Sequence, residues 1–345
     1  MKRHARLPVL LGLIGLTGLC ISLSCKQKPG QESVVLYTSL DRPHSEPIIR
    51  LFEKRTGIRV KVVYDTEAAK TVGLVNRLIA EKKNPQADVF WNSEVLRTLV
   101  LKDKGVLSAY ASPAADNIPA DMKDPAHYWT GFAARARVIF YNKSRVGEPP
   151  KTLEELTTPP WKGKVAIANP LFGTTNTQLA AWWSVWGADR TKDFLRRMHA
   201  NDVIICQGNA MARDMVVSGE ASVCLTDTDD AWAAIAHGHP VGMIYPDQDR
   251  GNGQGTLVIP NTVCLIKGGP HATNARKLID FLLSEEVEKT LAYSESAQIP
   301  LRHVAGLPGH VETMLRIKRI PVDFAKASRC VRDAGLHVQK HFQPK

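Results

Sequence analysis

Three carboxylates lie within four consecutive positions at Asp227, Asp229 and Asp230, between an apolar segment at 221–225 and a helical pattern that contains Trp232. Carboxylates held this close together repel one another, and a bound cation relieves the repulsion. Hard metal ions and organic ammonium groups both bind to carboxylate oxygens. The segment therefore indicates a site for a positively charged ligand.

Further acidic residues follow two other predicted strands: Asp41 follows 33–38, and Glu94, next to Ser93, follows 88–91. The carboxyl ends of parallel strands meet at one edge of a sheet, so these groups are expected to converge. Each acid has a simpler alternative, because a carboxylate also stabilises the N-terminus of the helix that follows it. We expect a metal site made by Asp41, Glu94, Asp229 and Asp230, with Ser93 and Asp227 beside it.

Aromatic and hydroxyl side chains near these loops keep other ligands open. Trp91 and Trp232 could hold a polyamine or another organic ammonium group through cation–π contact, although core packing is the alternative for both. Thr174 and Thr175 open a predicted helix and, with Arg42, could seat a phosphonate or a phosphorylated solute. The same hydroxyls are also ordinary helix caps.

Strands and helices alternate along the chain. Strands are expected at 33–38, 59–64, 88–91 and 165–168, and helices at 46–56, 67–82, 94–104 and 272–283. This alternation predicts an α/β fold with mostly parallel sheets covered by helices on both faces. Long extended runs at 131–141 and 255–263 are expected to cross between two hinge-linked lobes around a cleft. The predicted lobes comprise 33–128 plus 256–312, and 129–255 plus 313–345.

The N-terminal segment indicates export. Basic residues precede an apolar run at 7–23 that is too short to span a bilayer, so residues 1–24 are predicted to be a signal peptide. The segment 22–25 resembles a bacterial lipoprotein box, which makes Cys25 the expected lipid anchor, and an ordinary cleaved signal is the alternative. The predicted location is the periplasm or the outer face of the cell membrane.

Composition and motifs narrow the function. The 44% of hydrophobic residues supply core for two domains, and the net charge of +11 comes without a lysine-rich block, so no nucleic-acid partner is expected. Export permits disulfides among Cys206, Cys224, Cys264 and Cys330, while free thiols are equally compatible. No GxSxG, HExxH or phosphate-loop motif occurs, which leaves a carboxylate-dependent exported hydrolase only as an alternative of another class.

Five segments carry a family resemblance: 35–39 (VLYTS), 52–58 (FEKRTGI), 87–91 (ADVFW), 219–221 (GEA) and 274–283 (NARKLIDFLL). Together they resemble the periplasmic solute-binding proteins of ABC importers, in the ferric-ion-binding branch. The resemblance implies a two-lobed periplasmic-binding-protein fold, an importer permease as partner, a monomer, no enzymatic activity and no cofactor. In that family a His, a Glu and two adjacent Tyr commonly hold iron, often with a bound anion.

The family's ligand types have all changed in this chain. The family's His position falls on Asp41, its Glu position on Ser93 with Glu94 next to it, and its Tyr pair on Asp229 and Asp230. Oxygen donors remain, and hard cations accept carboxylates. We therefore expect a transported cation, with iron(III) or another hard metal ion as the first candidate, with or without an anion bound beside it.

Overall fold

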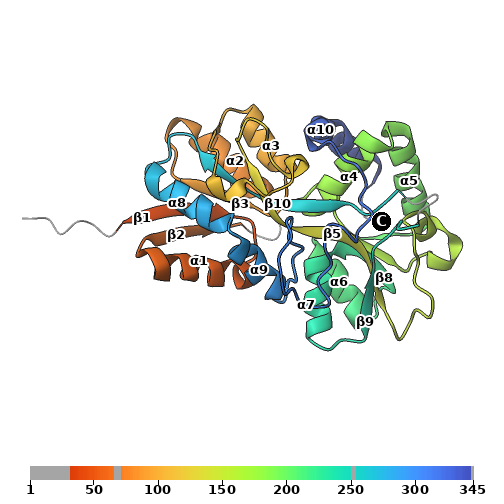
Figure 1. Cartoon of the computed structure of the whole chain (residues 1–345). Helices are drawn as coiled ribbons and strands as arrows, with labels where there is room; N and C mark the ends of the chain where they lie inside the picture. Colours follow the sequence, from red (N-terminus) through yellow and green to blue (C-terminus); the bar gives the residue numbers. More distant parts are fainter. Residues whose placement is uncertain (1–31, 66–70, 250–253, 343–345) are drawn as a thin grey trace, which may run out of the picture. The chain divides into compact units, whose positions relative to one another are not determined.

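The computed structural model describes residues 32–65, 71–249 and 254–342 (Figure 1). The predicted signal peptide and Cys25 lie outside the described residues. The strands are β1 (Ser33–Thr38), β2 (Arg59–Tyr64), β3 (Val89–Asn92), β4 (Leu107–Ser108), β5 (Thr130–Asn142), β6 (Val165–Ala168), β7 (Ile204–Cys206), β8 (Val223–Asp227), β9 (Val241–Ile244) and β10 (Val258–Ile266). The α-helices are α1 (Arg42–Thr56), α2 (Val72–Ala80), α3 (Leu96–Asp103), α4 (Gly173–Val185), α5 (Ala188–Ala200), α6 (Asn209–Ser218), α7 (Thr228–Ala236), α8 (Ala272–Leu282), α9 (Glu285–Tyr293) and α10 (Phe324–His341).

The strands are hydrogen-bonded in the order β2-β1-β3-β10-β5-β8-β6-β7, with β4 on β10 and β9 on β5. The outer groups β2-β1-β3 and β8-β6-β7 are parallel, as predicted. Strands β5 and β10 run antiparallel to their neighbours, so the sheet is mixed and not mostly parallel at its centre. Strand β5 joins the two parallel groups, because it pairs with β10 along its first half and with β8 and β9 along its second.

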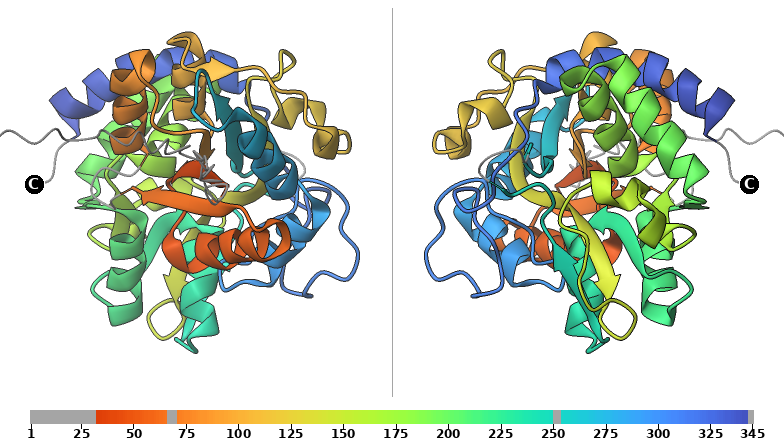
Figure 2. Two further views of the ribbon diagram at one scale, coloured as in Figure 1. Left: turned by 90° about the vertical axis from the view of Figure 1, so that its left-hand side faces the viewer. Right: turned by 90° about the vertical axis from the view of Figure 1, so that its right-hand side faces the viewer.

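Helices cover the strands on opposite sides, with α1 and α10 far apart across them in Figures 1 and 2. Helix α1 buries Ile48, Ile49 and Phe52 against the core and ends at Gly57, whose φ of 70° suits a glycine. It begins four residues before the predicted start at 46, because Pro43 is tolerated in a first turn whose N–H groups have no helical partner. Asp41 is thus the residue directly before the helix, and the backbone N–H of His44 in the first turn donates to the carbonyl oxygen of Asp41 at 3.1 Å.

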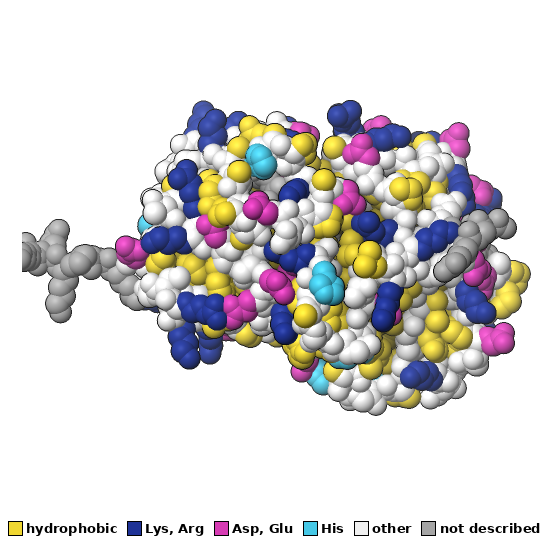
Figure 3. Space-filling view, in the orientation of Figure 1, with side chains coloured by type: hydrophobic (Ala, Val, Ile, Leu, Met, Phe, Trp, Pro, Cys, Tyr) yellow, Lys and Arg dark blue, Asp and Glu magenta, His cyan; other side chains and the backbone are white. Residues whose placement is uncertain are grey.

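On the face drawn in Figure 3, Lys and Arg are interspersed with Asp and Glu, as expected for a solvated basic surface.

The four cysteines of the described residues are free thiols: Cys206, Cys224, Cys264 and Cys330. The first two lie on β7 and β8, on either side of β6. Within the described ranges, no helix has the length and apolar character needed to cross a membrane.

Candidate functional site

A cavity of about 440 Å³ lies where several strand-to-helix junctions meet. Its walls come from the start of α1, the β3–α3 junction, the middle of β5, and the starts of α4, α6 and α7. The predicted site residues that line it are Asp41, Ser93, Thr174, Thr175, Asp227, Asp229 and Asp230. Trp91 and Glu94 do not line it. The fold therefore brings most of the predicted site together, as expected from the ends of neighbouring strands.

The acid loop, which we define as Asp227–Asp230, forms one wall. Asp227 is the last residue of β8, and Asp229 and Asp230 lie in the first turn of α7. One oxygen from each of the three carboxylates lies within 4.8 Å of the others, an arrangement that could hold a metal ion. The positive end of α7 favours negative charge at this position. The side chain of Asp227 makes no capping hydrogen bond to α7.

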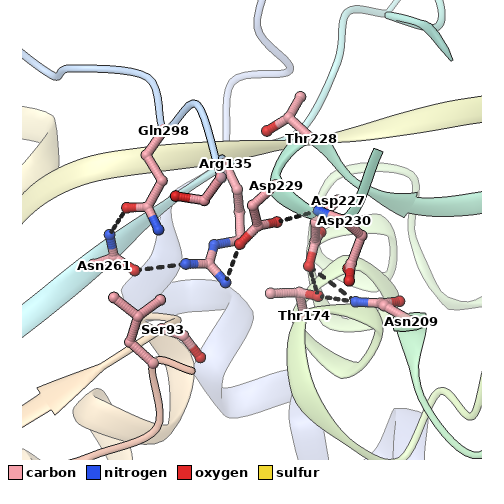
Figure 4. Close-up of polar contacts among 12 residues, drawn as sticks. Ser93, Arg135, Thr174, Asn209, Asp227, Thr228, Asp229, Asp230, Asn261 and Gln298 are labelled. Carbon is pink, nitrogen blue, oxygen red and sulfur yellow. Dashed lines mark hydrogen bonds and ion pairs between the residues drawn. The ribbon is translucent and has the colours of Figure 1, made fainter. Parts of the chain in front are cut away.

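Each carboxylate of the acid loop is accompanied by an arginine. Asp227 Oδ1 lies 2.8 Å from Nη1 of Arg137. Asp229 Oδ2 lies 3.1 Å from Nη1 of Arg135 (Figure 4). Asp230 Oδ1 lies 3.7 Å from Nη1 of Arg213. The repulsion predicted from the sequence is therefore relieved in part by the protein itself. The cavity carries both signs of charge, which the spacing of the acids alone did not predict.

Asp227 connects three of the elements that line the cavity. It is 2% exposed, and its Oδ2 accepts hydrogen bonds from Thr174 Oγ1 at 2.5 Å and from Asn209 Nδ2 at 2.9 Å. Thr175 Oγ1 donates to Asn209 Oδ1 at 3.2 Å. These contacts tie the starts of α4 and α6 to the end of β8. Both oxygens of Asp227 therefore contact other protein side chains, and its role is structural. Asp229 and Asp230 are the candidate ligands of the acid loop.

The electrostatics connect the acid loop to the start of α1. Burial lowers the pKa of His44 from its ordinary value, and the negative charges of Asp229 and Asp41 oppose that effect. Burial also disfavours charge on Arg135, but the carboxylates of Asp229, Asp227 and Asp41 outweigh it and raise the pKa of this arginine. The imidazole is therefore biased toward its neutral form, which is the form that binds metals.

Glu94 and Trp91 lie away from the cavity. The Glu94 carboxylate is buried, and it accepts hydrogen bonds from the backbone N–H groups of Leu96 and Arg97 at 2.6 and 2.9 Å and from Thr177 Oγ1 at 2.9 Å. Burial raises its pKa. These bonds favour the capping alternative for Glu94 over metal ligation. Trp91 packs in the core against Phe132, with ring centroids 5.3 Å apart.

Several residues of the cavity were not predicted from the sequence. They are Arg135, Arg213, His44 and Asn209. Arg135 could have been found from the sequence, because Arg135 and Arg137 lie two residues apart in the otherwise apolar stretch 131–141. Two guanidinium groups on one face of a buried strand need acidic partners, and the acid loop supplies them.

Comparison with known proteins agrees with this architecture. Iron uptake protein A1 of Synechocystis sp. is 29% identical over 340 aligned residues, which cover 90% of this chain and 92% of that protein. A putative 2-aminoethylphosphonate-binding periplasmic protein of Salmonella typhi is 28% identical over 265 residues, covering 74% of this chain and 76% of the relative. Iron-bound HitA from Pseudomonas aeruginosa has the same fold, with a TM-score of 0.78 at 23% identity over 89% of this chain and 99% of that one.

These matches confirm the two-lobed periplasmic-binding-protein fold. They also support the prediction that the chain binds a solute and does not catalyse a reaction, since the matched proteins are binding and uptake proteins. The family pattern of the bacterial extracellular solute-binding proteins matches residues 84–327, which is more than half of the sequence. The chain belongs to the family of bacterial extracellular solute-binding proteins.

Proposed function

We propose that this protein is the substrate-binding component of an ABC importer and that it captures a cationic solute, with iron(III) or another hard metal ion as the ligand. The observation that carries the proposal is the acid loop, whose three carboxylates offer oxygens within 4.8 Å of one another at the wall of a cavity. Asp41 and His44 line the same cavity from the start of α1. Oxygen donors of this kind suit hard cations.

The remaining parts of the proposal concern where the protein works. An iron uptake protein among the relatives supports iron as cargo, which is released to a permease and is not a cofactor. In this role the protein works in the periplasm or on the outer face of the cell membrane as a monomer, with Cys25 as its lipid anchor. Asp229, Asp230 and Asp41 supply ligand oxygens, and Ser93, Thr174 and Thr175 line the space around the cargo.

The test begins with the cargo. Protein purified without chelators is examined by native mass spectrometry with elemental analysis, and the metal-free protein is then titrated with iron(III) by calorimetry. We expect one equivalent of metal and a rise in melting temperature by mass action. A folded protein that neither retains a metal nor binds iron(III), manganese(II) or another hard cation would contradict the proposal.

The colour of the complex tests the ligand set separately. No tyrosine occurs among the described residues that line the cavity. An iron(III) complex held by Asp41, Asp229 and Asp230 therefore lacks an intense phenolate-to-iron band in the visible spectrum. A deeply coloured ferric complex of the wild-type protein would mean that other residues hold the metal.

A zwitterionic aminophosphonate is the second candidate. The specific observation in its favour is that Arg135, Arg213 and the start of α4 face the same cavity as the acid loop, so both signs of charge are offered. The relative from Salmonella typhi supports it. Tight binding of 2-aminoethylphosphonate without metal, with weak binding of ethylphosphonate, would favour this ligand over iron(III). A polyamine is less well supported, because Trp91 is in the core and Trp232 packs against His310 and does not line the cavity.

A further inference from the structure

Arg135 and Arg137 lie two residues apart on β5, yet the structure uses them differently. Every nitrogen of the Arg137 guanidinium has a partner: Nε donates to Gln178, Nη1 contacts Asp227, and Nη2 donates to Thr175. Its side chain has no exposed area. A guanidinium satisfied in this way is part of the framework, because moving it would break several buried hydrogen bonds at once.

Arg135 is held by fewer contacts. Nη1 contacts Asp229 at 3.1 Å, Nη2 donates to Asn261 Oδ1 at 2.7 Å, and Nε is a buried donor without a hydrogen-bond partner in the described parts of the chain. The residue is 3% exposed and lines the cavity. A buried N–H without an acceptor is unfavourable, so this incomplete pairing needs an explanation.

The contact with Asn261 accounts for the geometry of Arg135. Arginine pairs with a carboxylate most strongly through two parallel hydrogen bonds, and that arrangement requires two nitrogens to face the acid. Here one of the two terminal nitrogens, Nη2, is bonded to Asn261 on β10, and the other, Nη1, makes the shortest contact with Asp229 (Figure 4). Asn261 therefore restrains the arginine from closing fully on the acid loop.

Asn261 is itself fixed from two sides. Its Nδ2 donates to Gln298 Oε1 at 2.7 Å and to the carbonyl oxygen of Ala133 at 3.2 Å. Asn261 and Gln298 have no exposed area, and neither lines the cavity. The backbone around them is strained: Ala133 and Ala297 have φ values of 40° and 43°, which non-glycine residues rarely adopt, and the β5–β10 register shifts at Asn261. Such strain persists only where the surroundings impose it.

We propose that Asn261 and Gln298 are positioning residues that hold Arg135 in a one-point contact with Asp229, so that the arginine neutralises the acid loop yet gives up Asp229 to an arriving cation. The proposal rests on the proposed function for the identity of that cation. The restraint itself is a property of the protein alone. Arg135 lies close to the point where β5 stops pairing with β10 and begins pairing with β8, so it can contact Asn261 on β10 and Asp229 in the acid loop, which follows β8.

The first test needs no ligand. A double-mutant cycle with Arg135→Gln and Asp229→Asn, followed by urea unfolding, measures the coupling between the two side chains. We expect this coupling to be larger in an Asn261→Ser background than in the wild-type background, because the freed arginine can form a two-point pair. The matched control is Asn142→Ser, a buried asparagine on β5 outside the cavity that should leave the coupling unchanged. Equal coupling in all three backgrounds overturns the proposal.

The second test uses iron(III) as the probe. Asn261→Ser should weaken binding about ten- to hundredfold, as supporting residues around metal sites do, and Asn142→Ser should not. Adding Asn261→Ser to Arg135→Gln should produce no further weakening, because the residue acts through the arginine. If the weakening is the same with and without Arg135, Asn261 has a purely structural role and the proposal fails.

A milder variant guards against misfolding. Gln298→Met keeps the size of the side chain and removes the oxygen that Asn261 contacts, so we expect the same changes at smaller amplitude. If this variant alone folds, unchanged coupling between Arg135 and Asp229 overturns the proposal. Wild-type protein that does not bind iron(III) rejects the proposed function, whereas the ligand-free cycle still decides the role of Asn261.

Discussion

The acid loop and the β3–α3 junction look alike in sequence and behave differently in the structure. Both follow a buried strand, both open a helix, and both carry acidic side chains. At the β3–α3 junction, the Glu94 carboxylate accepts hydrogen bonds from the first two N–H groups of the helix that follows it. In the acid loop, Asp229 Oδ1 also accepts from one backbone N–H, that of Asp230 at 3.2 Å, but both Asp229 and Asp230 face arginine side chains at a cavity.

The difference lies in what each carboxylate has as its partner. Backbone N–H groups at a helix start have no partner within the helix, so withdrawing a buried carboxylate that accepts hydrogen bonds from them is unfavourable. Arginine side chains can move away, because only their rotamers change. Glu94 is therefore structural, because it caps α3 from a buried position, whereas Asp229 and Asp230 pair with arginine side chains at the cavity and are the candidate ligands. Asp227 is also structural although its partners are side chains, because it joins β8 to the starts of α4 and α6.

Removing the carboxylates of the acid loop gives the largest expected effect. The double substitution Asp229→Asn and Asp230→Asn keeps the side-chain shape and should weaken iron(III) binding about a hundredfold or more, since each lost ligand charge removes much of the attraction. Calorimetric titration measures the affinity, and circular dichroism checks the fold. If a folded variant bound iron(III) as tightly as the wild type, neither residue would be a ligand, and the acid loop would not differ from Glu94 in function.

Removing the carboxylate of the β3–α3 junction should affect stability. Glu94→Ala deprives two helix N–H groups and Thr177 of their acceptor, so the free energy of unfolding should fall by about 2–4 kcal/mol. Urea unfolding measures this change. Iron(III) affinity of the folded fraction should stay within about threefold of wild type, and a loss comparable to that of the acid-loop variant would reassign Glu94 to the site.

The pH dependence of stability tests the burial of Glu94. Burial raises its pKa above the ordinary value of 4.5, so between the two values the folded protein holds a proton that the unfolded chain has released. In that range the free energy of unfolding falls as the pH rises. We expect urea unfolding from pH 4 to 8 to show this fall, and Glu94→Gln to reduce it. A variant with the same pH profile as wild type would mean that Glu94 has an ordinary pKa.

The sequence predicted the positions of the strands near the site better than it predicted the side-chain contacts within the site. Strands β1, β2 and β6 match the predicted ranges, because apolar residues run through β1 and β6 and alternate with charged residues at the start of β2. The convergence of Asp41 with the acid loop also followed, since strand ends in α/β folds share an edge. The pairing of Asp229 with Arg135 did not, because it joins residues that are distant in the chain.

Two further features could not be read from local patterns. The antiparallel direction of β5 and β10 depends on how the chain returns between the lobes, and the same apolar run fits either direction. Whether Glu94 caps a helix or lines a cavity depends on the rotamer of one side chain. Acidic residues at strand ends therefore predict the place of a site, while their division into ligands and caps requires the three-dimensional contacts.

Ser93→Ala is the substitution with the smallest expected effect, and it tests whether the β3–α3 junction contributes any ligand group. It is the residue by which the β3–α3 junction reaches the cavity, but it is 2% exposed, and its hydroxyl lies 3.1 Å from Ser39 Oγ, which also donates to Asn92. A hydroxyl already engaged with protein adds little to a ligand. Ser93→Ala should therefore change iron(III) affinity by less than about threefold in calorimetry. A tenfold loss would show that this junction contributes a ligand group after all, and that its difference from the acid loop is one of degree.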